Sequence, residues 1–349
     1  MHEVEDVLTS RRQVAVAAVV VLYLVAVPFI TTAYVTEIFF TGLVFVMLGV
    51  SWNLLAGYAG QVSLGHAAFF GIGAFVAAWV TTPTRAGLPE ALSLPGAPGL
   101  VTVLFALVVG TLAAALLAAV TGPIMFRLTG HYFAIGTLAL ASIIKLVMVD
   151  ARGLTGGSTG YYVSGYVGDD GMFLLTLAAT LGIVAVTYRI VDSPSGLGMR
   201  AIHDDEDAAS SLGVNPLKYK LYAFVLSSGM AGLAGGLYAQ FTLYVNPDST
   251  LNVVWMVDTL VVVILGGMGT VLGPLFGAGL FVGLDTLLRS FAGEFATTIE
   301  GALIILFMLF APQGVYGFVI DRYRDEDEPP AATDPEAAPL EGSTPEHNE

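Results

Sequence analysis

The chain of 349 residues contains no cysteine, and only 12% of its residues are charged. The absence of cysteine excludes disulfide bonds and thiolate metal sites. A soluble domain carries roughly twice this share of charged residues. Hydrophobic residues make up 56% of the chain, and its mean hydropathy is +0.79. The composition therefore predicts an all-α polytopic membrane protein.

Motifs that bind nucleotides or metal ions are also missing. The sequence has no G-x-x-x-x-G-K-[ST] loop, so the chain cannot hydrolyse ATP by itself. No histidine pair has the spacing of a metal site, and Gly267-Met-Gly269 is not followed by the rest of a dinucleotide fingerprint. We therefore expect no metal, no cofactor and no catalytic residue in this chain, and no nucleic acid among its partners.

Ten apolar segments are long enough, or nearly long enough, to cross a membrane at about 20 residues a span. We place them near residues 14–33, 38–56, 63–81, 99–121, 132–149, 172–190, 218–245, 252–266, 272–289 and 297–311. The first is longer than the apolar part of a signal peptide and lacks a small-residue cleavage site, so we expect it to be retained. The sequence thus predicts a transmembrane domain of about ten helices over residues 14–318.

Basic residues are distributed unevenly between the connecting segments. With the N-terminus (residues 1–13) in the cytoplasm, nine of them lie on the cytoplasmic side and three lie outside. The nine are Arg11, Arg12, Arg127, Arg189, Arg200, Lys218, Lys220, Arg322 and Arg324; the three are Arg85, Arg152 and Arg289. Because segments rich in Lys and Arg stay in the cytoplasm, we expect a multi-pass cell-membrane protein, in contact with lipid, with both termini cytoplasmic.

The last segment, residues 319–349, differs from the rest in composition. From Asp321 onward it holds ten acidic residues and two arginines, and it is rich in proline and alanine. Such a segment buries too little apolar surface to offset the entropy lost on ordering. We therefore expect an acidic, disordered cytoplasmic tail.

The largest internal polar break, residues 193–217, lies between the sixth and seventh predicted helices, on the cytoplasmic side. A short helix is predicted over 197–212, and Gly213 stops it because glycine takes the left-handed position that follows a helix. Its small alanines would let this helix seat in a groove of another protein, whereas a solvated helix with no partner is the alternative. The candidate docking residues are Asp207, Ala208, Ala209 and Gly213.

Two glycine-rich breaks fall on the cytoplasmic side, at residues 57–66 and 265–274. Each is followed by a helix with closely spaced small residues, and the weak likeness between them is consistent with internal symmetry, which in transporters brackets the substrate path. Close helix packing through small residues would explain the same pattern. Both interpretations stay open.

Polar side chains in or beside the spans are candidates for a translocation path. They are Gln61, Ser63, His66, Lys145 and Asp258. A charge within the membrane is costly and is often functional, and we expect Lys145 and Asp258 in the outer half, where they would pair or line a path. The alternatives are that Lys145 snorkels to the surface, that Asp258 is a structural partner, and that the first three satisfy backbone groups at the break.

Five motifs occur in order along the membrane part of the chain. They are Asn53-Leu-Leu-Ala-Gly-Tyr-Ala-Gly-Gln-Val-Ser-Leu-Gly-His-Ala-Ala-Phe-Phe-Gly-Ile-Gly-Ala74, His131-Tyr-Phe-Ala-Ile-Gly-Thr-Leu-Ala139, Leu154-Thr-Gly-Gly-Ser158, Leu265-Gly-Gly-Met-Gly-Thr270 and Pro312-Gln-Gly314. With them the chain resembles the permeases of branched-chain amino acid ABC transporters. Permeases of ATP-driven importers carry a cytoplasmic Glu-Ala-Ala-x-x-x-Gly loop, and here Asp207 stands in place of the glutamate.

This resemblance implies a permease subunit that moves leucine, isoleucine or valine by alternating access. It implies two ATPase subunits, which bind ATP and Mg and dock on residues 193–217. It also implies a second, homologous permease and an extracytoplasmic amino-acid-binding protein.

Other functions fit parts of the sequence. Permeases for urea or short amides look alike over the same motifs. A secondary transporter or channel could use Asp258 and His66 as a proton relay, although residues 193–217 would then have no role. An intramembrane serine protease with Ser63 and His66 lacks the third group that orients the base.

Overall fold

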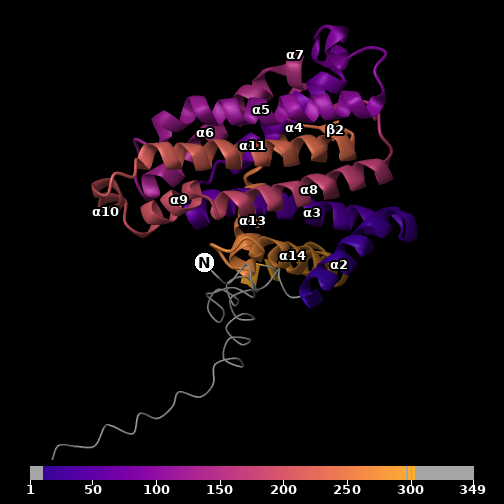
Figure 1. Cartoon of the computed structure of the whole chain (residues 1–349). Coiled ribbons are helices and arrows are strands. Elements are labelled where there is room, and N and C mark those ends of the chain that lie inside the picture. The colour runs from indigo at the N-terminus through magenta and orange to yellow at the C-terminus, as the bar shows by residue number, and fades with distance from the viewer. Residues whose placement is uncertain (1–10, 296–297, 300, 303–349) are drawn as a thin grey trace, which may run out of the picture.

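The computed structural model describes residues 11–295, 298–299 and 301–302. Within them the fold is a bundle of long helices that run roughly side by side (Figure 1). The one sheet in this part is a two-residue antiparallel ladder between β1 (Tyr161–Tyr162) and β2 (Tyr244–Val245), which the sequence did not predict.

Three predicted segments fall wholly or mostly outside the described residues. They are the N-terminal segment at 1–13, the tenth span at 297–311 and the acidic tail at 319–349.

The long helices of the described residues overlap the first nine predicted spans. They are α2 (Arg11–Ile30), α3 (Ala33–Asn53), α4 (His66–Thr81), α5 (Gly99–Met125), α6 (His131–Asp150), α8 (Asp169–Val191), α11 (Pro216–Thr242), α13 (Val253–Gly266) and α14 (Gly273–Ala292). In this part of the chain seven segments are long and apolar enough to cross a membrane, while α4 and the apolar part of α2 are shorter. The prediction of an all-α polytopic membrane protein is confirmed, whereas the predicted number of ten spans is not.

Shorter elements connect these helices. They are the π turn η1 (Leu54–Tyr58), the 3-10 turns η2 (Pro83–Ala86), η3 (Glu90–Ser93), η4 (Gly157–Thr159) and η5 (Gly293–Phe295), and the short α-helices α7 (Arg152–Thr155), α9 (Pro194–Asp204), α10 (Glu206–Ser211) and α12 (Pro247–Thr250).

Local sequence explains where several helices begin. Asn215 precedes α11, and its Oδ1 accepts a hydrogen bond from the Lys218 N–H; Asn252 caps α13 through the Val254 N–H in the same way. Pro216 follows the first of these caps. Proline suits the first helical position because its missing N–H has no partner there, and the asparagine caps satisfy N–H groups that the helix leaves open.

The centre of the bundle is α4, which is almost wholly buried between α11 and α5. Glycines allow the backbones of α4 and α11 to approach closely. A Cβ added at Gly73 would collide with the Gly232 carbonyl, and one at Gly235 would collide with the Phe70 carbonyl. Small residues at such contacts are the usual way in which membrane helices pack.

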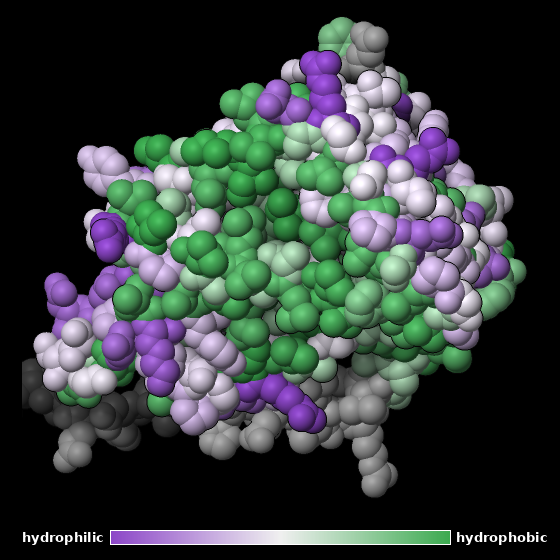
Figure 2. Space-filling view, turned by 90° about the horizontal axis from the view of Figure 1, so that it is seen from above, coloured by the Kyte–Doolittle hydropathy of each residue, from purple (hydrophilic) through white to green (hydrophobic). Residues whose placement is uncertain are grey.

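The outer faces of the bundle are apolar. On α5 the side chains of Leu112, Leu116 and Val120 are each more than 60% exposed. Figure 2 shows a broad hydrophobic band across one face, between more polar ends. Such a surface faces lipid, because a soluble protein rarely exposes so large an apolar patch.

The connecting segments gather at two opposite ends of the bundle, which we name by the predicted orientation. The inner end holds residues 59–65, 194–213 and 267–272, and the outer end holds residues 82–98, 151–168 and 243–252. At the outer end the ladder of β1 and β2 joins two of these segments. Successive spans therefore alternate between the ends as the sequence predicted.

The prediction of a single helix over 197–212 was wrong. The structure has two helices, α9 and α10, separated at Asp205. Asp205 has an extended backbone (φ −157°, ψ 110°), and its carboxylate accepts hydrogen bonds from the N–H groups of Asp207 and Ala208. An aspartate that caps a new helix in this way competes with continuation of the preceding one.

Candidate functional site

The first glycine-rich break begins in η1 and ends at the first residue of α4, and its freed backbone groups find partners in neighbouring side chains. The indole Nε1 of Trp52 donates to the carbonyl of Ser63 at 2.7 Å, and the Leu64 N–H donates to the Thr137 hydroxyl at 3.0 Å. The Gly65 N–H donates to the Ser63 hydroxyl at 3.2 Å. Irregular backbone at membrane depth is tolerated where protein satisfies it in this way.

The second glycine-rich break is attached to the first by one side chain, Asn53. Its Nδ2 donates to the Thr270 carbonyl at 2.7 Å, and its Oδ1 accepts from the Gly269 N–H at 2.8 Å. A Cβ on Gly57 would approach the Gly269 nitrogen to 2.7 Å. The two breaks, more than 200 residues apart, thus form one contact at the inner end.

The helix α9 reaches this contact from the polar break. His203 Nδ1 lies 3.0 Å from the Gly57 carbonyl oxygen. We call the set Asn53, Gly57, His203, Gly269 and Thr270 the inner junction. The sequence placed Asn53 and Gly57 in a motif and His203 in the polar break, but nothing in it indicated that they meet.

The candidate docking residues lie on and just after α10, which projects from the bundle in Figure 1. Gly213 has a φ of +88°, and its N–H donates to the Ser210 carbonyl while the Val214 N–H donates to the Ala209 carbonyl. This is the two-bond helix ending that favours glycine, so the predicted stop is confirmed.

The surface of α10 is largely open. Asp207, Ala208 and Gly213 are exposed, and Leu212 is 86% exposed, whereas Ala209 is buried. An ion pair between Glu206 and Lys220 attaches α10 to α11. The exposed leucine beside small and acidic residues is a surface suited to contact with another protein.

Three candidate path residues lie together in the first break. The Gln61 amide donates to the Ala59 carbonyl at 3.3 Å, and Ser63 is fully buried. His66 is 1% exposed, and its two ring nitrogens have no hydrogen-bond partner among the described residues. The hydrogen bond that a Ser63–His66 catalytic pair would need is therefore absent.

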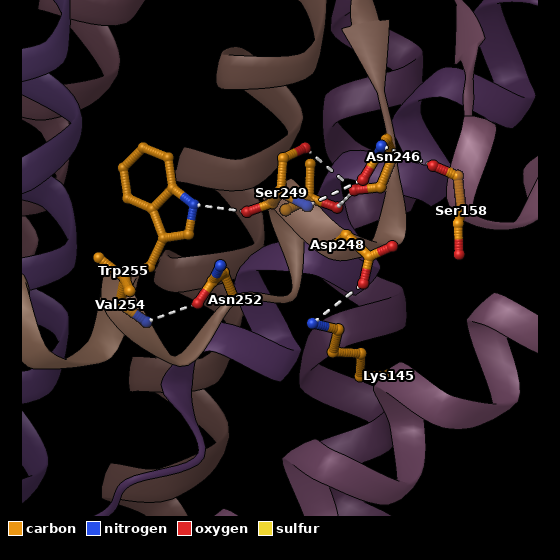
Figure 3. A network of polar contacts seen from close by, with 9 residues as sticks. Lys145, Ser158, Asn246, Asp248, Ser249, Asn252, Val254 and Trp255 are labelled. Atoms are coloured by element: carbon orange, nitrogen blue, oxygen red, sulfur yellow. Dashed lines mark hydrogen bonds and ion pairs between the residues drawn. The ribbon is translucent and has the colours of Figure 1, made fainter.

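Lys145 lies at the outer end, where its Nζ is 3.2 Å from Asp248 Oδ1 (Figure 3). The same network includes Asn246, whose amide donates to the Ser158 carbonyl at 2.9 Å. Burial raises the pKa of the nearby Tyr161 hydroxyl in β1. We call residues 154–163 and 243–252, with Lys145, the outer platform.

Asp258 lies apart from the other candidates. It lines a cavity of about 480 Å³ between α3, α13 and α14, together with Asp285 and Arg289. The structure therefore groups Gln61, Ser63 and His66 in the first break, and it places Lys145 and Asp258 in different surroundings. The sequence indicated neither the partner of Lys145 nor the cavity beside Asp258.

A helical bundle with an apolar belt and helices interrupted at facing glycine-rich breaks defines a polytopic membrane protein, and such interrupted helices are a feature of many membrane transport proteins. Comparison of the sequence with known protein families identifies the family. Residues 34–312 match the family described as branched-chain amino acid transport system, permease component, and the chain belongs to it.

Relatives with a described role include the high-affinity branched-chain amino acid transport system permease protein LivM of Escherichia coli K12. It is 28% identical over 338 residues, which cover 88% of this chain and 75% of LivM. The LivM protein of Salmonella typhimurium is 28% identical over 322 residues, covering 83% and 72%. LivH of E. coli is 31% identical over 146 residues, covering 41% and 46%. No solved structure matches the chain.

Proposed function

We propose that this chain is a permease subunit of an ATP-binding-cassette importer for branched-chain amino acids. The observation that carries the proposal is the family match over residues 34–312. The similarity to LivM over 88% of the chain agrees with it. A permease for urea or short amides is the alternative that a transport assay must separate.

The second permease of the importer is a LivH-like protein. The chain is similar to LivM over most of its length and to LivH over 41% of it, as expected if LivM and LivH are homologous to each other. We therefore propose a pair of one LivM-like chain and one LivH-like chain, which meet in the membrane. An extracytoplasmic binding protein delivers the amino acid to their outer side.

Two ATPase subunits supply the energy, because the sequence has no phosphate-binding loop. They dock on α10, which places the inner end, the N-terminus and the C-terminus in the cytoplasm. The exposed surface around Asp207 and Leu212 supports this docking site. Ten spans, including one over 297–311, complete the topology.

The contact between His203 and Gly57 connects α9 and α10, where the ATPases dock, to the membrane helices. When the ATPases close and move α10, α9 moves with it, since the two helices adjoin at Asp205. The hydrogen bond from His203 then acts on η1 and on the break that follows it. Movement of helices at this break would alternate access to the path.

Reconstitution tests the proposal. The chain, a LivH-like partner, two ATPases and the binding protein are placed together in vesicles, and uptake of labelled leucine and of urea is measured with and without ATP. We expect leucine uptake that needs ATP and every subunit. Uptake of urea alone would favour the alternative, and gradient-driven uptake by the chain without ATPases would overturn the importer.

A further inference from the structure

Lys220 is a buried cation at the inner end of α11. It lies on the second turn of this helix and is 7% exposed. A charge taken out of water is costly unless a counter-charge accompanies it. The Lys220 Nζ lies 2.5 Å from Oε2 of Glu206 on α10, and the Glu206 side chain is 47% exposed. This ion pair therefore joins the exposed helix α10 to the interior of the bundle.

The surroundings of Lys220 depend on where α10 lies. If α10 moved without α11, the ammonium group would stay buried and lose its counter-charge, which is far costlier than breaking an exposed ion pair. The pair of Lys145 and Asp248, whose side chains are both partly exposed, has no such constraint. Only residues 212–215 separate α10 from α11 along the chain. The ion pair and this short connection therefore hold α10 and the first turns of α11 together.

One turn further along α11, Phe224 contacts α4. Residues four apart lie on the same face of a helix, so Phe224, which is fully buried, shares the face of Lys220. Its ring meets that of Phe69 edge to face, with centroids 5.3 Å apart. Farther along, Gly73 and Gly232 bring the backbones of α4 and α11 together. A close-packed interior of this kind transmits a displacement, because it leaves little space to absorb one.

The contacts continue from α4 to the first glycine-rich break. The ring of Phe69 packs edge to face against His66, the first residue of α4, with 6.3 Å between centroids. A line of contacts therefore runs from the surface of α10 to the α4 side of the break. The contact between His203 and Gly57 reaches the other side of the break, at η1.

We propose that Glu206 and Lys220 are positioning residues of the importer, which carry the movement of α10 through Phe224 and Phe69 to the α4 side of the break. They act through these neighbours and not on the amino acid itself. Because His203 acts on the η1 side, the two connections together change how the sides of the break lie relative to each other. The inference rests on the proposed function, since it takes α10 as the place where the ATPases dock.

Charge reversal tests the ion pair. The complete importer is reconstituted in vesicles, and leucine uptake and phosphate release are measured in the same vesicles. Glu206→Lys and Lys220→Glu each place two like charges opposite one another, and we expect each to lower the leucine imported per ATP hydrolysed at least about tenfold. The double variant restores opposite charges, and its ratio should recover to within about threefold of the wild type.

Neutral variants separate positioning from stability. Lys220→Met combined with Glu206→Gln leaves no buried charge without a partner, and such replacements are often neutral for stability. We expect this double variant to unfold in detergent at the wild-type temperature but to import about threefold less leucine per ATP or lower. Lys220→Arg keeps the charge and should keep the wild-type ratio. Lys218→Met, at an exposed lysine near Lys220 on α11, is the matched control.

A double-mutant cycle tests the connection from Lys220 to Phe224. Phe224→Leu keeps an apolar side chain but weakens the contact with Phe69, and we expect it to lower the leucine imported per ATP about threefold. Combined with Lys220→Met, it should lower the ratio no further than the larger single effect, because both changes act on one set of contacts. Effects that multiply would overturn the connection. Assembly of every variant is checked by size-exclusion chromatography.

The outcomes separate the two proposals. If the complete importer transports leucine and the charge reversals or the neutral pair keep the wild-type ratio, the positioning role is overturned and the proposed function stands. Failure of the exchanged pair to restore the ratio has the same meaning. If the complete wild-type importer transports no branched-chain amino acid, the proposed function falls, and the positioning role falls with it.

Discussion

At the scale of single residues, Asn53 explains how two distant breaks are kept together. An asparagine amide carries both a donor and an acceptor, and here the donor faces the Thr270 carbonyl while the acceptor faces the Gly269 N–H. Both backbone groups lie where helical hydrogen bonds end. A residue of similar size that lacked either the donor or the acceptor would leave the Thr270 carbonyl or the Gly269 N–H without its hydrogen bond.

We expect Asn53→Ala to destabilise the protein by about 1–3 kcal/mol for each backbone group it leaves buried and unpaired. Asn53→Asp should cost at least as much, because it keeps the acceptor for Gly269 but buries a carboxylate with one oxygen against the Thr270 carbonyl. Thermal unfolding in detergent measures both. Gln61→Ala is the control, since Gln61 makes one long hydrogen bond at the same break. Equal losses of stability in Asn53→Ala and Gln61→Ala would contradict the role given to Asn53 in joining the two breaks.

Lys145 is a contrasting case, a charge near the outer end that has an ion-pair partner in the outer platform. Its ion pair with Asp248 joins two side chains that are 34% and 50% exposed. Exposed pairs contribute about 0–1 kcal/mol. We therefore expect Lys145→Ala to change stability by less than about 1 kcal/mol and to leave leucine uptake unchanged. A large loss of leucine uptake in vesicles would instead indicate that Lys145 lines the translocation path.

At the scale of elements, α9 and α10 behave as two short helices with separate contacts. The polar break was predicted because hydropathy and glycine stops are local properties, and Gly213 indeed ends α10. The division at Asp205 was missed because an acidic run is compatible with one helix or with a new cap. The contact between His203 and Gly57 spans 146 residues, and no local pattern encodes it.

Docking through α10 predicts loss of coupling when its end is changed. Proline fixes φ near −65°, whereas Gly213 has a φ of +88°, so Gly213→Pro must alter the chain after α10. Asp207→Lys reverses an exposed charge. We expect both to abolish leucine uptake in the reconstituted importer while the ATPases remain active and the chain remains in the membrane. Unchanged uptake in both variants would contradict docking at this site.

Loss of the hydrogen bond between His203 in α9 and the Gly57 carbonyl should cause a milder defect in coupling. His203→Ala removes one hydrogen bond, worth about 0.5–1.5 kcal/mol, so the leucine imported per ATP hydrolysed should fall up to about tenfold. The measurement compares uptake with phosphate release in the same vesicles. His131→Ala, at the start of α6 and outside the inner junction, is the control. A parallel fall in both rates would indicate lost assembly instead.

At the scale of the whole molecule, hydropathy was enough to predict the positions of nine apolar helices in the described residues, of which seven segments are long and apolar enough to cross a membrane. It could not predict which helix becomes the centre. That depends on close approach at Gly73 and Gly235, which requires knowing the neighbours. The cavity beside Asp258 likewise depends on three helices that meet only in the folded chain.

The orientation of the whole chain is a prediction from the basic residues, and the absence of cysteine makes it directly testable. A single cysteine at exposed Ser211, on α10, should be unreactive toward a membrane-impermeant maleimide in intact cells and reactive after permeabilisation. A cysteine at exposed Glu90, in the outer segment 82–98, should react in both conditions. Leu116→Cys is the internal reference: this side chain is 66% exposed in the apolar belt and should react in neither condition. Reversed reactivity at Ser211 and Glu90 would place α10 outside, where no ATPase can reach it.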